Sequence, residues 1–257
     1  MKHPMCAVVT GANKGIGLEI CRRLASNGIM VILTARNEKR GVEAVENIRQ
    51  SGLSDVVFQK LDVKDSASVT SLATFIQTQF GKLDILVNNA GDGGLIMNCE
   101  AVRAFKLKGI KQTYEKAKEC VETNYYGTKR SPRIMNMSSF YGQVKYINYE
   151  KVKAGLEDFD SLTVEKLDEI LQWFLSDFKE NKLQDNGWPI TVSACISRKH
   201  TSFQVNNVHP GVVKTEMTCY TGNLTAEEGA RFAVMLALSP EDTRSGLFFN
   251  EMNVSSF

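Results

Sequence analysis

The sequence lacks the features that would direct a protein to a membrane or to nucleic acid. Its formal net charge is only +2 over 257 residues, which gives no electrostatic reason to expect nucleic acid or an anionic membrane surface as a partner. No apolar run approaches the ~20 residues of a membrane-spanning helix. The first expected strand begins near Met5, which leaves no room for a signal or transit peptide. These absences favour a cytoplasmic protein.

The sequence also lacks the cysteine motifs of redox-active and metal-binding proteins. No two cysteines follow a C-x-x-C pattern or the spacing of metal ligands, and the three histidines cluster with nothing. The cysteines are Cys6, Cys21, Cys99, Cys120, Cys195 and Cys219. We therefore expect no metal site, and we expect reduced thiols throughout, as is usual in cytosolic proteins.

The first 90 residues alternate short apolar segments with amphipathic ones. Strands are expected at 6–9, 30–34, 56–61 and 83–87, and helices at 15–27, 38–50 and 66–80. Strands that alternate with helices of this length predict an α/β fold, with a doubly wound parallel sheet and right-handed crossovers.

The pattern is less regular after residue 91. A helix is expected at 112–129, strands at 133–137, 204–208 and 246–249, and a late helix at 225–238 that begins with a Thr225/Glu228 capping box. Residues 146–189 form an acidic, helical segment without a strand pattern, which we interpret as an insert. We therefore predict one domain over residues 1–257, with a dinucleotide-binding half at 1–91.

A glycine-rich segment, Thr10-Gly11-Ala12-Asn13-Lys14-Gly15-Ile16-Gly17, lies between the first strand and the first helix. Gly11 permits the tight turn, Gly15 lets the backbone approach a pyrophosphate, and Gly17 allows close packing of helix and strand. The free N–H groups and the dipole at the helix N-terminus would then bind the phosphates. The segment predicts a nicotinamide dinucleotide as cofactor.

The end of the second strand favours NADP(H) over NAD(H). An acidic residue there would bind the ribose 2′-hydroxyl, but the strand ends Leu33-Thr34-Ala35-Arg36. Arg36 and Lys14 can together accept a 2′-phosphate, although both could also be solvated surface cations. Asp62 is placed to accept from adenine. Its alternative role is the N-cap of the next helix, for which Asp65 is better placed.

The glycine-rich segment and Asn88-Asn89-Ala90-Gly91, which closes the fourth strand, resemble the short-chain dehydrogenase/reductase (SDR) family. Much of the chain resembles the plant branch of this family, the monomeric carbonyl-reductase-like enzymes of the salutaridine reductase and neomenthol dehydrogenase group. The resemblance lies in the long insert and in segments 33–40, 80–91, 124–127, 209–211 and 245–249. The resemblance implies a Rossmann-type sheet and an NADP(H)-dependent oxidoreductase. The implied substrate is a small apolar ketone or secondary alcohol of terpenoid or alkaloid type. It also implies a monomer, because the insert covers the helical face through which other members form tetramers.

The resemblance assigns roles to further residues. It adds Asn13, Ile16, Val63, Asn89 and Gly91 to the cofactor-binding set, and Thr215 as the residue that holds the nicotinamide carboxamide. Asn124 matches the asparagine that holds a proton-relay water, and Ser139 matches the serine that hydrogen-bonds the substrate carbonyl. In the family, hydride passes from the nicotinamide to the carbonyl carbon. A tyrosine, its pKa lowered by a nearby lysine, supplies the proton.

The Tyr-x-x-x-Lys pair of the family is displaced in this sequence. By spacing, Cys195 occupies the tyrosine position and Lys199 the lysine position. A thiol can donate a proton, but it reaches less far than a phenol, and an inert buried cysteine is the alternative. Tyr141 and Lys145 match the motif literally. Tyr141 lies only two residues past Ser139, in an expected loop where nothing holds the pair on one helical face.

Two helical segments also look shortened. Only eight residues separate Asn124 from the strand at Arg133, and four separate Lys199 from Gln204. Parts of two crossover helices on one side of the sheet are therefore expected to be missing, which would expose the apolar residues Ile134, Met135 and Val205. Three readings follow: a working reductase, a nucleotide-binding pseudoenzyme without turnover, or a truncated product that folds poorly.

The substrate pocket is expected between segment 92–113 and the insert. Four large apolar side chains suggest an apolar ligand, although core packing explains them equally well: Met97, Phe105, Phe140 and Trp188.

Overall fold

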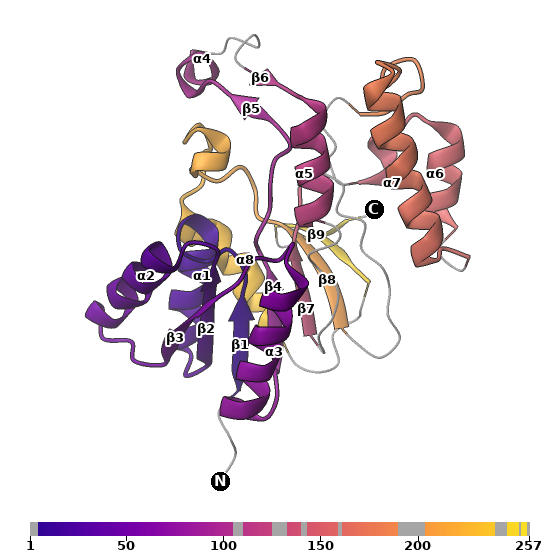
Figure 1. Cartoon of the computed structure of the whole chain (residues 1–257). Helices are drawn as coiled ribbons and strands as arrows, with labels where there is room; N and C mark the ends of the chain where they lie inside the picture. Colours follow the sequence, from indigo (N-terminus) through magenta and orange to yellow (C-terminus); the bar gives the residue numbers. More distant parts are fainter. Residues whose placement is uncertain are drawn as a thin grey trace.

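Eight strands form one sheet in the order β10-β9-β8-β7-β4-β1-β2-β3 (Figure 1). The computed structural model describes residues 5–104, 110–124, 133–139, 143–158, 161–189, 204–239, 246–251 and 253–255. The strands are β1 (Cys6–Val9), β2 (Met30–Ala35), β3 (Val56–Lys60), β4 (Ile85–Asn88), β7 (Arg133–Met137), β8 (Gln204–His209), β9 (Phe248–Asn250) and β10 (Asn253–Ser255). All neighbours are parallel except β9 and β10. The predicted doubly wound α/β sheet is confirmed. The antiparallel edge strand β10 was not predicted.

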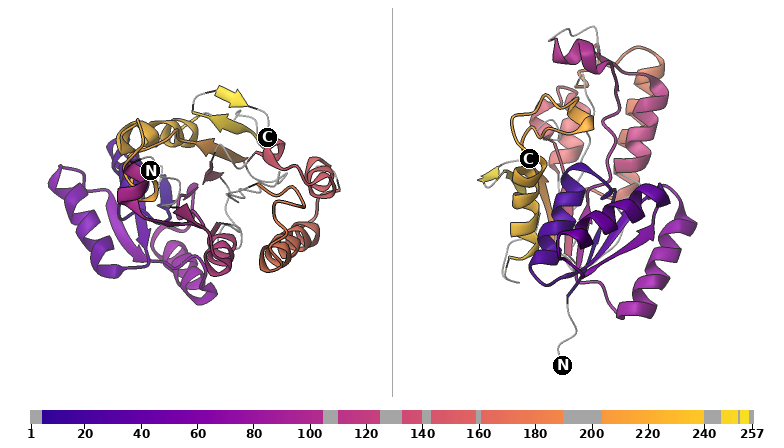
Figure 2. Two further views of the ribbon diagram at one scale, coloured as in Figure 1. Left: turned by 90° about the horizontal axis from the view of Figure 1, so that it is seen from above. Right: turned by 90° about the vertical axis from the view of Figure 1, so that its left-hand side faces the viewer.

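Helices cover both faces of the sheet (Figure 2). One face carries α1 (Gly15–Ser26), α2 (Glu38–Gln50) and α8 (Ala226–Ala237), and the other carries α3 (Ser66–Phe80) and α5 (Tyr114–Asn124). The strand order reverses between β1 and β4, because β2 and β3 lie on one side of β1 while β4 and all later strands lie on the other. In open sheets of this kind, ligands bind beside the carboxyl ends of the strands at this reversal.

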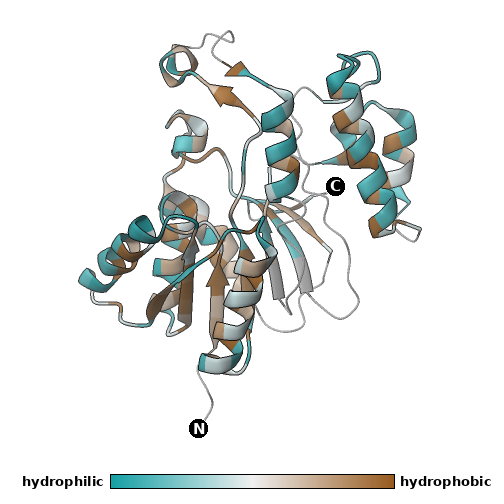
Figure 3. Cartoon of the chain, viewed as in Figure 1, coloured by the Kyte–Doolittle hydropathy of each residue, from teal (hydrophilic) through white to brown (hydrophobic). Residues whose placement is uncertain are grey.

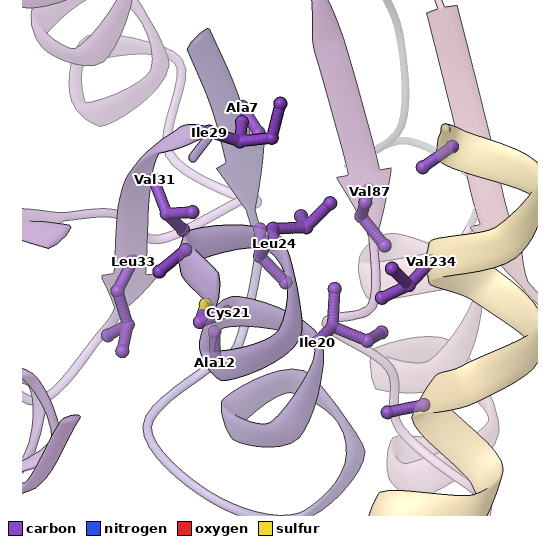
Figure 4. Packing of buried hydrophobic residues seen from close by; sticks show 14 of the residues in the cluster. Ala7, Ala12, Ile20, Cys21, Leu24, Ile29, Val31, Leu33, Val87 and Val234 are labelled. Carbon is purple, nitrogen blue, oxygen red and sulfur yellow. The ribbon is translucent and has the colours of Figure 1, made fainter. Parts of the chain in front are cut away.

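Alternation along the strands builds two cores. In β1, Ala7 and Val9 pack toward α1, whereas Cys6 and Val8 pack toward α3. Figure 4 shows the first core, where Val31 and Leu33 of β2 lie beside Ile20 and Leu24 of α1, with Val234 of α8 nearby. The strands here are apolar on both faces, as expected of a parallel sheet covered on both sides, while α2 is largely hydrophilic (Figure 3).

Local caps explain why several helices begin where the sequence predicts. Asn37, Asp65 and Thr225 precede α2, α3 and α8, and each side chain accepts a hydrogen bond from a first-turn backbone N–H. Glu228 completes the predicted capping box with Thr225. Gly81 ends α3 in the left-handed conformation, with φ +74°. Asp65, and not Asp62, is thus the N-cap of α3.

The insert forms its own hydrophobic core against α5. The helices α6 (Glu150–Glu157) and α7 (Val164–Lys179) follow the single turn η4 (Val144–Tyr146), and α7 packs on α5. Within 146–158 and 161–189 the structure contains no strand, as predicted. Trp188 is buried in this core beside Phe174, and its Nε1 donates to Asp177 at 2.7 Å. Trp188 is therefore a core residue of the insert.

A small arm and a disulfide were not expected from the sequence. The strands β5 (Ile96–Met97) and β6 (Ile110–Lys111) pair antiparallel and flank the short helix α4 (Cys99–Arg103). Cys99 is disulfide-bonded to Cys219, with their Cα atoms 5.1 Å apart. The expectation of six reduced thiols is thus wrong for these two. Nothing in the spacing of cysteines 120 residues apart could have shown the pairing.

The expected exposure of Met135 is also wrong. Met135 is 4% exposed and lies in the core beneath α1 and α8, because its side chain points to the opposite face from the one where the shortened helices were expected. The side chains of Ile134 and Val205 fall outside the described residues, as do segments 125–132 and 190–203, where the two short connections lie.

Candidate functional site

The glycine-rich loop and the Asn88-Asn89-Ala90-Gly91 segment meet at the carboxyl ends of β1 and β4. The Thr10 hydroxyl accepts hydrogen bonds from the backbone N–H groups of Asn89 and Ala90, at 3.0 and 2.9 Å. In return, Asn89 Nδ2 donates to the carbonyls of Thr10 and Gly11, at 2.9 and 3.1 Å. Gly11 has φ +61°, and a Cβ there would lie 2.8 Å from Ala90 Cα. Only glycine fits this turn.

The start of α1 has the properties of an anion site. Lys14 is its N-cap residue, and no described side chain accepts a hydrogen bond from the first-turn N–H groups there. A Cβ on Gly17 would lie 2.9 Å from Ala12 Cα, so the helix packs closely against the loop that precedes it. The N–H groups and the positive dipole end thus remain available to phosphate oxygens. The residues present fit a dinucleotide pyrophosphate.

A second loop, which follows β8, lies beside the glycine-rich loop. A Cβ on Gly15 would be 3.4 Å from Thr215 Cγ2, so the two loops are in contact. Thr215 leads into the turn η5 (Glu216–Thr218), and its backbone N–H donates to Thr218 Oγ1 at 3.1 Å. The Thr218 hydroxyl in turn donates to Val213 O at 2.6 Å. These bonds fix the loop that carries Thr215.

The residues expected around the adenosine half lie at the ends of β2 and β3 and at the start of α1. Arg36 and Lys14 are both exposed, and the Ala12 N–H donates to Thr34 O at 2.8 Å, which ties the glycine-rich loop to the end of β2. The Asp62 carboxylate accepts from the Lys64 backbone N–H at 3.0 Å. Three further members of the set are placed near the same edge: Asn13 in the loop, Ile16 in the first turn of α1, and Val63 after β3.

Asn124, the last residue of α5, contacts the segment that follows β4. Its Oδ1 accepts from the Asp92 N–H and its Nδ2 donates to the Asp92 carbonyl, both at 3.0 Å. Nδ2 also lies 3.2 Å from Cys120 Sγ. A Cβ on Gly91 would be 3.6 Å from Asn124 Oδ1. The amide of Asn124 therefore holds the segment after β4 against α5.

Ser139 lies two residues after β7 and is partly buried. It follows Ser138, whose backbone N–H donates to Val208 O at 2.7 Å. The position is at the same edge of the sheet as the glycine-rich loop, because β7 neighbours β4. Cys195, Lys199 and Tyr141 lie outside the described residues, so the identity of the proton donor stays a prediction.

His209 ends β8 close to the Ser138 backbone. Burial lowers the pKa of its imidazole, and the charge of Glu251 opposes this effect only partly. His209 is therefore neutral near pH 7. In the part of the chain that the structure describes, no three His, Cys, Asp or Glu side chains gather as metal ligands, and no helix is long and apolar enough to cross a membrane.

Two polar features were missed in the sequence. Thr10 is one of them, since its hydroxyl organises the turn after β4. The other is a ladder of three asparagines in register across adjacent strands. Asn88 Nδ2 donates to Asn136 Oδ1 at 2.9 Å, and Asn136 Nδ2 donates to Asn207 Oδ1 at 3.2 Å. The sequence signal that could have predicted this ladder is an asparagine near the end of each of the three strands.

Comparison with known proteins gives close matches over nearly the whole chain. The family described as short chain dehydrogenase matches residues 5–168. (+)-Neomenthol dehydrogenase from Arabidopsis thaliana is 47% identical, with 99% of this chain and 98% of the relative covered. Carbonyl reductase (NADPH) 1 from Bos taurus is 33% identical, with 96% of each covered. The solved structure of salutaridine reductase from Papaver somniferum has a TM-score of 0.89 and 43% identity, and covers 96% of this chain and 99% of that one.

The alignment also shows that this chain lacks internal residues that its relatives have. The match to neomenthol dehydrogenase extends over 291 positions, whereas this chain has 257 residues, so at least 34 aligned positions face no residue of this chain. This agrees with the prediction that internal segments are missing, without locating them. The relatives are named as dehydrogenases and reductases, and they give no support to a pseudoenzyme.

Proposed function

The chain belongs to the short-chain dehydrogenase/reductase family and is an oxidoreductase, and we propose that it interconverts a ketone and a secondary alcohol with NADP(H). The proposed substrate is a small apolar molecule of terpenoid or alkaloid type, because the similar proteins are named for neomenthol and salutaridine. The observation that carries the proposal is the geometry of the glycine-rich loop. Asn89 holds this loop at the start of α1, where no described side chain caps the first-turn N–H groups.

The cofactor would lie across the carboxyl ends of β1 and β4. The N–H groups of the first turn of α1 would bind the pyrophosphate, and Lys14 and Arg36 the 2′-phosphate. Asp62 would accept from adenine, and Thr215 would hold the carboxamide. The bound cofactor supplies or accepts the hydride.

Ser139 and Asn124 are proposed to serve the reacting end. The Ser139 hydroxyl would donate a hydrogen bond to the substrate carbonyl, which polarises the carbon that receives hydride. Asn124, at the end of α5 and fixed there by its two bonds to the Asp92 backbone, would position a relay water. The proton is proposed to come from Cys195 with Lys199 beside it, or from Tyr141.

The first test is a fluorescence titration that uses the two tryptophans as donors to the nicotinamide. NADPH should saturate the protein at lower concentration than NADH, because only NADPH offers a 2′-phosphate. Arg36→Ala should weaken NADPH binding by about tenfold to a hundredfold and leave NADH unchanged, since hydrogen bonds to charged groups are lost. Lys182→Ala removes an exposed cation of the insert and is the control. Equal affinities for the two cofactors in the wild type would contradict the NADP(H) assignment.

The second test identifies the proton donor. NADPH consumption with a ketone panel should vanish in either Cys195→Ala or Tyr141→Phe, while NADPH affinity stays as in the wild type. If both variants keep full activity, neither residue is the acid. If the wild type binds NADPH and reduces no ketone of the panel, the proposed reduction of small apolar ketones is contradicted.

A monomer in the cytoplasm is also proposed. The insert packs through α7 on α5, so this face of α5 is covered within the chain. Light scattering at the mass of one 28.6 kDa chain would support the monomer. A cytoplasmic location would place the bond between Cys99 and Cys219 in reducing surroundings, where such bonds are rare and usually transient.

A further inference from the structure

An ion pair joins the two loops that flank the proposed cofactor site. The Lys14 ammonium is in direct contact with the carboxylate of Glu216. Lys14 is the N-cap of α1, and Glu216 opens η5 directly after Thr215. The two residues are 202 positions apart in the sequence, so the fold alone creates this contact.

The carboxylate of Glu216 lies among cations of the nucleotide-binding half. The hydrogen bond and charge of Lys14 hold the pKa of Glu216 below its usual range, and the charge of Arg40 lowers it further. Arg40 belongs to the first turns of α2, four residues after Arg36. Carboxylate and phosphate oxygens both accept charge-assisted hydrogen bonds from Lys and Arg. Glu216 thus offers these cations the same kind of partner as a phosphate group.

We propose that Glu216 is an internal competitor for the 2′-phosphate of NADPH at Lys14. The inference rests on the proposed function, in which Lys14 binds that phosphate. In the protein without cofactor, Glu216 neutralises Lys14. NADPH must displace this carboxylate, whereas NADH has no 2′-phosphate and leaves the ion pair in place. Glu216 therefore lowers the preference of the enzyme for NADPH and makes the loop after β8 responsive to which cofactor is bound.

The exposure of the pair sets the size of the effect. The side chain of Lys14 is 52% exposed and that of Glu216 is 58% exposed. Exposed ion pairs change an equilibrium constant by at most about fivefold, and salt screens them. A change of roughly threefold to fivefold in NADPH affinity at low salt is therefore expected, and a smaller change at high salt.

The test compares Glu216→Gln with the wild type in NADPH and NADH titrations. The NADPH dissociation constant should fall about threefold to fivefold, and the NADH constant should stay the same. The control is Glu227→Gln, which removes another exposed carboxylate, 70% exposed, from a pair with Arg23 on α1. This control should change neither constant. Repeating Glu216→Gln in a Lys14→Met background separates local competition from a general change of charge, because the effect should then disappear.

Each other outcome has a defined meaning. Equal tightening of NADPH and NADH, weaker NADPH binding, or no change in Glu216→Gln would each overturn the competition. An effect that persists without Lys14 would show a long-range charge effect and overturn it as well. If wild-type protein shows no saturable NADPH binding, the proposed function fails, and this inference fails with it. If NADPH binds and only the Glu216 effect is absent, the proposed function stands.

Discussion

Gly17 and Asn89 approach each other so closely that a Cβ atom on Gly17 would fall 2.4 Å from Asn89 Nδ2. The same nitrogen donates hydrogen bonds to the carbonyls of Thr10 and Gly11. One amide therefore fixes the turn of the glycine-rich loop and also sets how near α1 can lie to the end of β4. The requirement for glycine at position 17 comes from this contact.

Gly17→Ala should destabilise the protein although alanine is the better helix former. The added methyl group would overlap Asn89 Nδ2 and lie 2.9 Å from Ala12 Cα, and backbone cannot yield as a flexible side chain does. Overpacking of this kind costs about 1–3 kcal/mol. Urea denaturation of the variant should show a lower midpoint with an unchanged slope.

Gly155→Ala provides the matched control, because Gly155 is also inside a helix. A Cβ there would lie 3.7 Å from Ile170 Cδ1, an ordinary contact. The substitution should stabilise the protein by up to about 1 kcal/mol, through helix propensity alone. The two variants should thus shift the midpoint in opposite directions. A shift of the same sign in both would show that the Gly17 contact does not limit packing.

Asn89→Asp keeps the size of the side chain and removes its N–H donors. The carbonyls of Thr10 and Gly11 would lose their partner and face a carboxylate, which should cost roughly 2–3 kcal/mol of unfolding free energy. NADPH affinity should fall too, because the loop is no longer held in place. The control Asn27→Asp removes an exposed bond to Arg23 O, and its cost should stay below about 1 kcal/mol. Equal costs would contradict the bracing role of Asn89.

Much of the nucleotide half could be predicted because its signals are local. The predicted helices at 38–50 and 66–80 match α2 and α3 in full, since Asn37, Asp65 and Gly81 mark their ends within one turn. The apolar strands likewise match within two residues. Caps and periodicity are properties of neighbouring residues, so the sequence alone contains them.

The remaining features depend on contacts between distant residues. The hydroxyl of Thr10 and the amide of Asn89 become partners only after β1 and β4 pair. The pairing of Cys99 with Cys219 likewise requires the arm around α4 to reach the loop after β8. Trp188 is a large apolar residue of the kind that lines pockets, and only the packing of the insert shows that it belongs to a core.

Reduction of the bond between Cys99 and Cys219 should destabilise the protein. The bond closes a loop across 120 positions, and its loss frees that loop in the unfolded state. A cost of about 2–4 kcal/mol is typical. Urea denaturation with and without dithiothreitol measures it. The variant Cys99→Ser should already have the lower stability and should not respond to dithiothreitol. A wild type that is insensitive to the reductant would contradict the prediction.

Stability should also fall between pH 7 and pH 5 because of His209. Burial lowers the pKa of this imidazole, so the folded protein holds it neutral, while the unfolded chain takes up a proton as the pH falls through ~6.5. The unfolded state then binds more protons, and the free energy of unfolding decreases by up to about 1.4 kcal/mol per unit of pKa difference, until the pH passes below the folded pKa. His209→Gln should flatten this part of the profile. Glu228→Gln should leave it unchanged, because the hydrogen bond from the Thr225 N–H lowers the pKa of Glu228 and confines its effect to pH below ~4.5. Equal slopes in the wild type and in His209→Gln would assign the acid sensitivity to other groups.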